Sequence, residues 1–264
     1  MEYLIYIYLF TLGIVLGSFY NVVGLRISEG LSIVSPGSRC PKCGHELGWY
    51  ENIPLFSYLF LKGKCKECGS KISIKYFLFE LLTGLLFMFA YFVVGWNLEL
   101  IVALSFISLF IIITISDLEY MLIEDKVVLF FLVLILGLRV FIEIPYSTFN
   151  LNPFVETLIG GLSGFGLLFS IMYFGGKLYK KEVMGGGDVK LYGIIGIVLG
   201  FKLTFLSLFL AALFGAALGL ILMKTKLIKR DTPVPFGPFI ALGSLVAYFY
   251  GMDLLNWYFG LFSM

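Results

Sequence analysis

Two aspartates lie beside long apolar runs, Asp117 in Ser116-Asp117-Leu118-Glu119 and Asp188 directly after Gly185-Gly186-Gly187. A carboxylate at the edge of a hydrocarbon layer costs a few kcal/mol unless it is paired or solvated, so such residues are candidates for a functional site. If packing brings the two together, their repulsion prevents both from ionising easily and one proton is shared. The ionised carboxylate can then activate water while the protonated one polarises an amide carbonyl, which is aspartic-protease chemistry.

Histidine is too scarce for the main competing chemistry. The chain has one histidine, His45, and no obvious nucleophile lies beside it, so a Ser-His-Asp or Cys-His arrangement is not expected.

Each candidate also has a structural interpretation. Asp188 stands just before Val189 and could cap a helix, an interpretation as good as catalysis from the residues alone. The three preceding glycines could be a flexible linker, or could let the backbone approach a substrate strand and act as a hinge. Asp117 ends its apolar run and is badly placed as a cap. The acidic residues after it are expected to be solvated loop charges: Glu119, Glu124 and Asp125.

The composition predicts an all-α polytopic membrane protein, because 60% of the residues are hydrophobic, 14% are charged and the mean hydropathy is +0.99. About eight transmembrane helices are expected, and the first of them is not expected to be a cleavable signal peptide. Their approximate ranges are Tyr3 to Leu25, Tyr76 to Gly95, Leu100 to Ser116, Val127 to Phe141, Phe154 to Gly176, Val189 to Phe201, Leu203 to Met223 and Phe236 to Tyr250.

Basic residues predict the orientation. All lysines and arginines except Arg139 and Lys202 fall in four segments, 26–75, 117–126, 177–190 and 224–230, which the positive-inside rule places in the cytoplasm. Asp117 and Asp188 are then expected at the same membrane face, with both termini outside. The run from Val189 to Phe201 is short for a full span, so Asp188 is expected inside the membrane boundary. Merging it with the next run would put the last basic segment outside, so two helices are predicted.

The polar segment 26–75 holds every cysteine of the chain, in Cys40-Pro-Lys-Cys43 and Cys65-Lys-Glu-Cys68. Two such pairs are typical of a zinc site with four thiolate ligands. The alternatives are a thioredoxin-like dithiol and disulfides, and stable disulfides are not expected in the cytoplasm. A site closed by four sulfurs leaves no open position, so the metal is predicted to be structural. Three parts are expected: a first transmembrane helix (1–25), a four-cysteine zinc-binding domain (26–75) and a transmembrane domain that carries both aspartates (76–264).

Further motifs resemble the bacterial type IV prepilin peptidases, a family of leader peptidases and N-methyltransferases among the GxGD intramembrane aspartyl proteases. The resemblance covers nearly the whole chain. It rests on the four cysteines, the glycine-aspartate motif and these stretches: Gly17-Ser18-Phe19-Tyr20-Asn21-Val22-Val23, Asn52-Ile53-Pro54, Tyr76 with Glu80, and Pro235-Phe236-Gly237-Pro238.

The resemblance implies that Asp117 and Asp188 are the catalytic pair and that the basic leader of a prepilin or pseudopilin of a pilus or type II secretion system is removed at the cytoplasmic face. It further implies N-methylation of the new N-terminus with S-adenosylmethionine, location in the bacterial cytoplasmic (inner) membrane, lipid contact and no nucleic-acid partner. The residues expected to support the active site are Gly185, Gly186, Gly187, Lys190, Pro235, Phe236, Gly237 and Pro238. The chain departs from the family at Glu124, where proline is usual, and at Glu51, where aspartate is usual.

Two other classes are open to this composition. An ion- or proton-coupled transporter would also use intramembrane carboxylates, but should show inverted repeats and carboxylates near the midplane, and neither is evident. A membrane-anchored binding module would use the zinc segment to recruit a partner, but leaves the two aspartates without a purpose.

Overall fold

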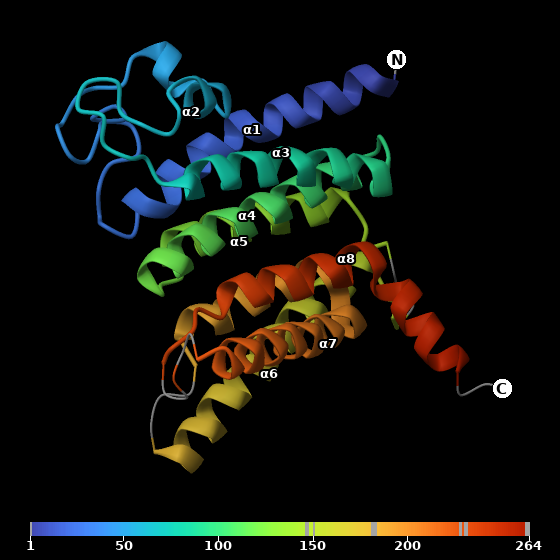
Figure 1. Cartoon of the computed structure of the whole chain (residues 1–264). Coiled ribbons are helices and arrows are strands. Elements are labelled where there is room, and N and C mark those ends of the chain that lie inside the picture. Colours follow the sequence, from blue (N-terminus) through green and yellow to red (C-terminus); the bar gives the residue numbers. More distant parts are fainter. Residues whose placement is uncertain are drawn as a thin grey trace. The chain divides into compact units, whose positions relative to one another are not determined.

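The structure, a computed structural model, describes residues 2–145, 148–149, 151–180, 184–226, 229 and 232–261, and in these parts it is helical with two isolated β-bridges. Long helices are α1 (Glu2–Arg26), α3 (Ile74–Val94), α4 (Glu99–Tyr120), α5 (Asp125–Phe141), α6 (Pro153–Tyr179), α7 (Gly186–Lys224) and α8 (Gly237–Gly260) (Figure 1). Two short elements lie between α1 and α3: the 3-10 helix η1 (Trp49–Asn52) and α2 (Phe56–Phe60).

The chain divides into two compact units, Met1–Ile115 and Ser116–Met264, with the boundary inside α4. Within the part of the chain that the structure describes, six helices are long and apolar enough to cross a membrane: α1, α3, α4, α6, α7 and α8. The 17-residue α5 is shorter, and the 39-residue α7 holds two of the expected helices. The expectation of a polytopic all-α protein is therefore confirmed, with six candidate membrane-spanning helices against the eight expected.

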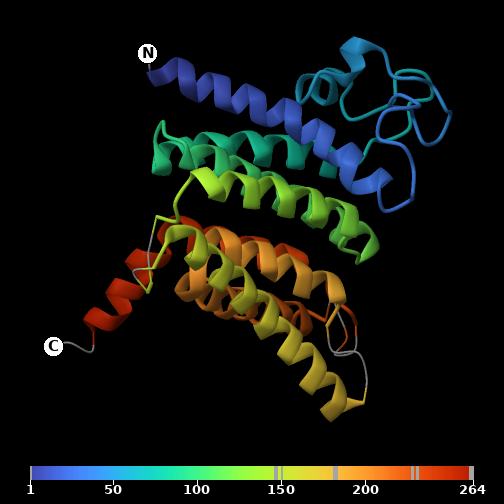
Figure 2. The same ribbon diagram turned by 180° about the vertical axis from the view of Figure 1, so that it is seen from behind.

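In the first unit, α1 and α3 run side by side (Figure 2) and approach closely because small residues face each other. A Cβ added at Gly13 would lie 2.7 Å from the Cα of Gly84. The hydroxyl of Tyr20 donates to Ser108 Oγ at 2.6 Å and ties α1 to α4.

In the second unit, α7 packs against α5, α6 and α8. A Cβ at Gly160 of α6 would overlap the carbonyl oxygen of Gly196 on α7, and a Cβ at Gly243 of α8 would lie 2.6 Å from the backbone nitrogen of Ala211. Glycine at these contacts lets the helix backbones meet without intervening side chains.

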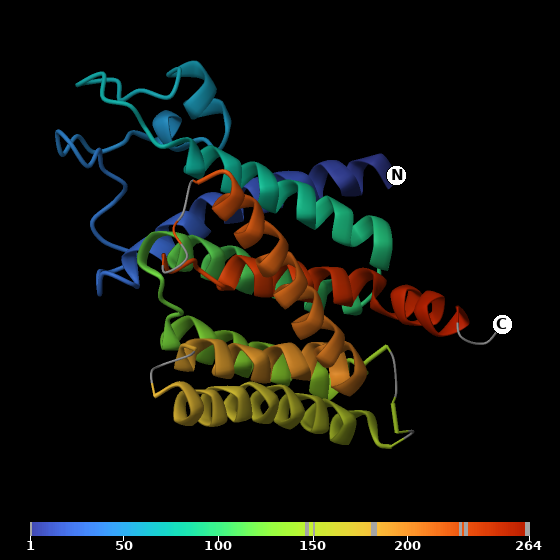
Figure 3. The ribbon, with the colours of Figure 1, turned by 60° about the horizontal axis from the view of Figure 1, so that its bottom comes forward.

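A sharp bend divides α7 at Gly200, whose φ of 70° and ψ of −179° are not helical (Figure 3). Such a break leaves carbonyls near it without intrahelical donors, and inside a membrane those groups need other partners. The buried guanidinium of Arg139 on α5 donates to the Val198 carbonyl at 3.0 Å. Because of the bend at Gly200, the first half of α7 is short, as the short apolar run from Val189 predicts.

Candidate active site and metal centre

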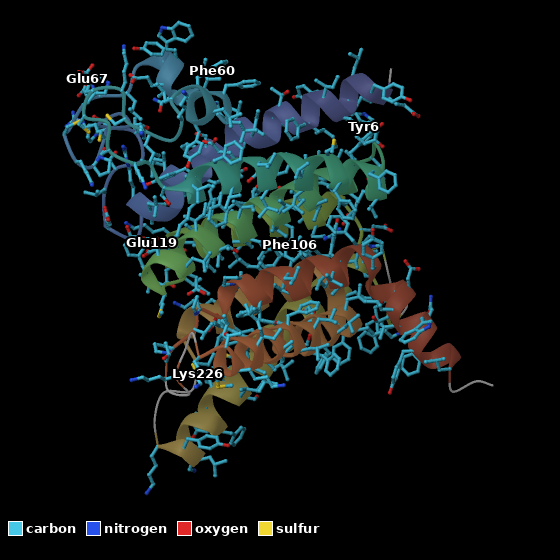
Figure 4. All side chains as sticks on the ribbon, in the orientation of Figure 1. Tyr6, Phe60, Glu67, Phe106, Glu119 and Lys226 are labelled. Carbon is cyan, nitrogen blue, oxygen red and sulfur yellow. The ribbon has the colours of Figure 1, made fainter. Side chains whose placement is uncertain are left out.

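The two candidate aspartates lie at one end of the second unit. Asp117 occupies the last turn of α4, two residues before Glu119, which Figure 4 labels, and Asp188 occupies the first turn of α7. Asp117 is buried, with 6% of its surface exposed, and Asp188 is partly buried. Their carboxylates are close enough for electrostatic repulsion between them. The structure thus brings together two acids that are far apart in the sequence.

Asp117 is held by the start of α8. The backbone N–H of Gly237, 120 positions along the chain, donates to Asp117 Oδ2 at 2.7 Å. Carboxylates are stabilised at helix N-termini by free N–H groups and by the helix dipole. A Cβ at Gly237 would lie 2.7 Å from the same oxygen, so only glycine allows this approach.

The neighbours of Gly237 shape the same helix start. Phe236 is the N-cap residue and its carbonyl accepts hydrogen bonds from the N–H groups of Phe239 and Ile240. Pro238 occupies the first turn, where a missing N–H costs nothing. Pro235 precedes the helix in irregular backbone. The Pro-Phe-Gly-Pro stretch therefore positions the Gly237 N–H so that it donates to Asp117.

Asp188 is not the N-cap of α7, so the capping interpretation of the sequence is wrong in detail. The helix starts at Gly186 with Gly185 as N-cap, which makes Asp188 its third residue. A Cβ at Gly185 would lie 3.5 Å from Asp188 Oδ2, so the backbone of the N-cap residue lies against this carboxylate. The third residue of a helix is the position from which an acidic side chain can reach back towards the N-cap.

The three glycines are not a loose linker. Gly186 and Gly187 belong to the first turn of α7, and a Cβ at Gly187 would lie 2.7 Å from the Cβ of Ile123. The glycine run allows the connection between α4 and α5 to pack directly on the backbone beside Asp188.

Asp125 corrects a further expectation, since it is not merely a solvated loop charge. It is the first residue of α5, and both of its carboxylate oxygens accept from Lys190 Nζ, at 2.7 and 2.8 Å. Glu124 is the N-cap residue of α5 and makes no capping hydrogen bond with its side chain, and Glu119 is exposed at the end of α4. The pairing of Asp125 with Lys190 has no local signal in the sequence, since the two residues are 65 positions apart.

The four cysteine sulfurs form the second candidate site, with all Sγ atoms within 4.8 Å of one another. Cys40 Sγ lies 3.8 Å from Cys68 Sγ, and Cys43 Sγ lies 3.9 Å from Cys65 Sγ. A Zn–S distance of about 2.3 Å implies sulfurs about 3.8 Å apart in a regular tetrahedron. The donor set and its dimensions therefore suit a structural metal. Figure 4 labels Glu67, which lies between Cys65 and Cys68 in the sequence.

The two cysteine pairs stand on matching backbone turns. Gly44 N–H donates to the Cys40 carbonyl and Gly69 N–H to the Cys65 carbonyl, each at 2.9 Å. Both glycines have positive φ, 73° and 66°, which residues with side chains rarely adopt. This repeated turn directs the sulfurs of each pair to a common centre.

His45 makes a structural contact in the cysteine segment. Its Nε2 lies 3.1 Å from Glu51 Oε2, which also accepts the Gly48 N–H at 2.8 Å. The Gly48 N–H, with a smaller contribution from His45, lowers the pKa of Glu51 below its usual range. Glu51 thus ties the first cysteine turn to η1.

The remaining motif residues join the cysteine segment to the membrane helices of the first unit. Glu80 of α3 is buried and accepts the Leu55 N–H at 2.8 Å and a hydrogen bond from Ser18 of α1. Asn21 of α1 donates to the Tyr76 carbonyl at 3.3 Å. Leu55, which follows Asn52-Ile53-Pro54, has a φ of 62°, and the hydrogen bond from its N–H to Glu80 helps to hold this conformation.

These features define a polytopic membrane protein with a carboxylate pair at one end of a helical unit and a four-cysteine metal centre in a separate segment. The family model described as the bacterial peptidase A24 N-terminal domain matches residues 11–94, and the type IV leader peptidase family matches residues 104–220.

Three similar proteins carry the name prepilin leader peptidase/N-methyltransferase. The protein from Bacillus subtilis is 40% identical over 95% of this chain and 96% of its own length. Those from Legionella pneumophila (35% identical, 87% and 78% covered) and Pseudomonas aeruginosa (32%, 94% and 91%) follow the same pattern. The chain belongs to the type IV leader peptidase family. No solved structure matches it significantly, and the transporter interpretation gains no support.

Proposed function

We propose that this protein is a membrane-embedded aspartyl endopeptidase that removes the leader peptide from type IV prepilins or pseudopilins. The observation that carries the proposal is the meeting of Asp117 and Asp188 at one end of the second unit. The names of its relatives supply the substrate class.

In the proposed reaction, the two carboxylates share one proton. The ionised carboxylate accepts a proton from water, whose oxygen attacks the scissile carbonyl carbon while the protonated carboxylate donates to the carbonyl oxygen. The carbon–nitrogen bond of the tetrahedral intermediate then breaks, the amine leaves with a proton from the pair, and the leader ends in a carboxylate.

The surrounding residues keep the pair in place. The N–H of Gly237 donates to the Asp117 carboxylate and the backbone of Gly185 lies against the Asp188 carboxylate, so both acids approach the substrate from fixed positions. We assign supporting roles to Gly185, Gly186, Gly187 and Lys190 on α7 and to Pro235, Phe236, Gly237 and Pro238 at the start of α8.

A second activity is proposed from the full-length similarity to proteins named as N-methyltransferases. In this activity the amine released by cleavage is methylated, with S-adenosylmethionine as the methyl donor. The metal bound by the four cysteines is proposed to be zinc with a structural role, since four thiolates leave no coordination position for substrate.

We place the active site and the cysteine segment at the cytoplasmic face of the bacterial membrane. The basic segments 26–75, 117–126, 177–190 and 224–230 support this orientation through the positive-inside rule. Asp117, Asp125, Asp188 and Gly237 meet at the same end of the second unit, as this orientation requires.

The test is to incubate the purified protein with a full-length prepilin and follow the substrate by gel and mass spectrometry. The wild type is expected to release a leader-sized fragment, and S-adenosylmethionine is expected to add a methyl mass to the new N-terminus. Asp117→Asn and Asp188→Asn should each abolish release, whereas Asp253→Asn, at an exposed carboxylate of α8, should not. Cleavage by both active-site variants would refute the assignment.

A further inference from the structure

The connection between α4 and α5 links the two aspartates physically. It starts directly after the helix that carries Asp117, where Met121 adopts a left-handed φ of 54° and its N–H donates to the Asp117 carbonyl at 2.9 Å. This left-handed helix end turns the chain away from the axis of α4. The connection then runs past the first turn of α7, which carries Asp188.

The connection meets that turn at two points. Ile123 lies against the backbone of Gly187, where a Cβ would be 2.7 Å from the Ile123 Cβ. Lys190 Nζ donates to both carboxylate oxygens of Asp125, at 2.7 and 2.8 Å. One contact precedes Asp188 by one residue and the other follows it by two.

Helix geometry determines on which side of α7 the Lys190–Asp125 ion pair lies. Successive residues of an α-helix are about 100° apart, so Lys190 projects about 200° from Asp188, on nearly the opposite side of α7. A bond to Lys190 therefore resists rotation of this turn about its axis without occupying the space in front of Asp188. The turn is glycine-rich and has little intrinsic rigidity of its own.

We propose that Asp125 and Lys190 are positioning residues, whose ion pair fixes the first turn of α7 so that Asp188 stays directed at Asp117. The inference rests on the proposed function and deepens it by naming what holds the pair together. The ion pair and the Ile123 contact form a clamp, defined by residues 123, 125, 187 and 190, that couples α7 to the helix end bearing Asp117.

A role limited to overall stability fits the pair poorly. The side chains of Lys190 and Asp125 are 49% and 69% exposed, and exposed ion pairs contribute little to folding. Catalysis is far more sensitive to small displacements of a reacting group, since an error of about 1 Å can cost about a hundredfold in rate.

The test uses charge neutralisation and charge reversal in the full-length protein in detergent or lipid. Asp125→Asn and Lys190→Gln are each expected to lower kcat for prepilin cleavage about tenfold or more with KM nearly unchanged. The exchanged variant, Asp125→Lys with Lys190→Asp, is expected to recover most of that loss. Lys126→Gln, which neutralises the exposed neighbour of Asp125, is the matched control and should cleave like wild type.

The exchange separates positioning from a direct effect of the Lys190 charge. If that charge acted on Asp188 itself, an aspartate at 190 would worsen the defect and the exchange could not rescue it. The proposal would be overturned if the single variants had unchanged kcat, or if the charge-swapped double variant had a kcat no higher than that of the single variants.

Hydrogen exchange gives a readout that needs no activity. Amides of residues 186–190 should exchange hydrogen faster in Asp125→Asn than in wild type. In the double variant with Asp125→Lys and Lys190→Asp, their exchange rates should return towards those of wild type. Unchanged exchange would contradict the clamp. Failure of the wild type to cleave any prepilin would instead refute the proposed function, while hydrogen exchange would still decide whether the pair holds the turn.

Discussion

Replacing Gly237 with alanine should disable the active site while leaving the fold intact. The added Cβ would lie 2.7 Å from Asp117 Oδ2, 3.1 Å from its Cγ and 3.2 Å from its Cβ. Real contacts of this kind need about 3.4 Å or more, so the carboxylate must move by about 0.7 Å. That movement breaks or stretches the 2.7 Å hydrogen bond from the Gly237 N–H.

The expected cost follows from that bond. A hydrogen bond to a charged group contributes about 1.5–3 kcal/mol, and each 1.36 kcal/mol corresponds to tenfold in rate. Gly237→Ala should therefore lower kcat for prepilin cleavage by about 10- to 150-fold. The assay is cleavage of a purified prepilin under saturating substrate, followed by mass spectrometry of the leader.

Gly137→Ala is the matched control, because a Cβ at this position of α5 meets no atom within 4 Å. It should cleave like wild type and gain up to about 1 kcal/mol of helix stability. Wild-type cleavage by Gly237→Ala would refute the argument that its N–H must hold Asp117.

Three further predictions concern the metal centre and the helix packing. Chelation, or Cys40→Ser, should release about one zinc per chain and speed hydrogen exchange across residues 38–72; retained protection without metal would contradict a structural metal. Glu51 has a lowered pKa, so its stabilising contribution is full above the unfolded pKa of about 4.3 and disappears as pH falls through the lower folded value. Hydrogen-exchange protection of residues 45–51 should fall over that acidic range, and Glu51→Gln should abolish this pH dependence. The same loss of protection at low pH in Glu51→Gln would exclude Glu51 as the cause of the pH dependence. Gly160→Ala forces a methyl onto the Gly196 carbonyl and should destabilise the protein by about 1–3 kcal/mol in thermal or denaturant unfolding, whereas Gly166→Ala, with no atom within 4 Å, should not. Equal stability of the two variants would show that α6 and α7 do not meet there.

Features that depend on local sequence could be predicted. The long apolar runs identify the helices, and the short run from Val189 already indicates the break that Gly200 imposes on α7. The cysteine centre is predictable for the same reason, because each CxxC turn sets two sulfurs by itself and only the meeting of two such turns is left to folding.

Contacts between distant segments could not be predicted from composition or spacing. The bond between Gly237 and Asp117 joins positions 120 apart, and the Lys190–Asp125 pair joins positions 65 apart. Both depend on how helix ends pack, which hydrophobic periodicity does not specify. Asp125 looks like an ordinary charge at a helix start, and only the fold gives it a partner.

The register of Asp188 in its helix was also beyond the sequence. A glycine run before an aspartate fits a linker and a cap equally well, since glycine disfavours the helix interior. The packing of Ile123 on Gly187 supplies the stabilisation that lets the helix begin at Gly186 and makes Asp188 its third residue.

The most direct test of the central claim is a double-mutant cycle on the two aspartates, measured as the single-turnover rate of prepilin cleavage. If Asp117 and Asp188 act as one unit, Asp117→Asn and Asp188→Asn should each lower the rate by about a thousandfold or more, and the double variant should be no slower than either. Losses that multiply in the double variant, or a single variant that keeps substantial activity, would contradict a catalytic pair.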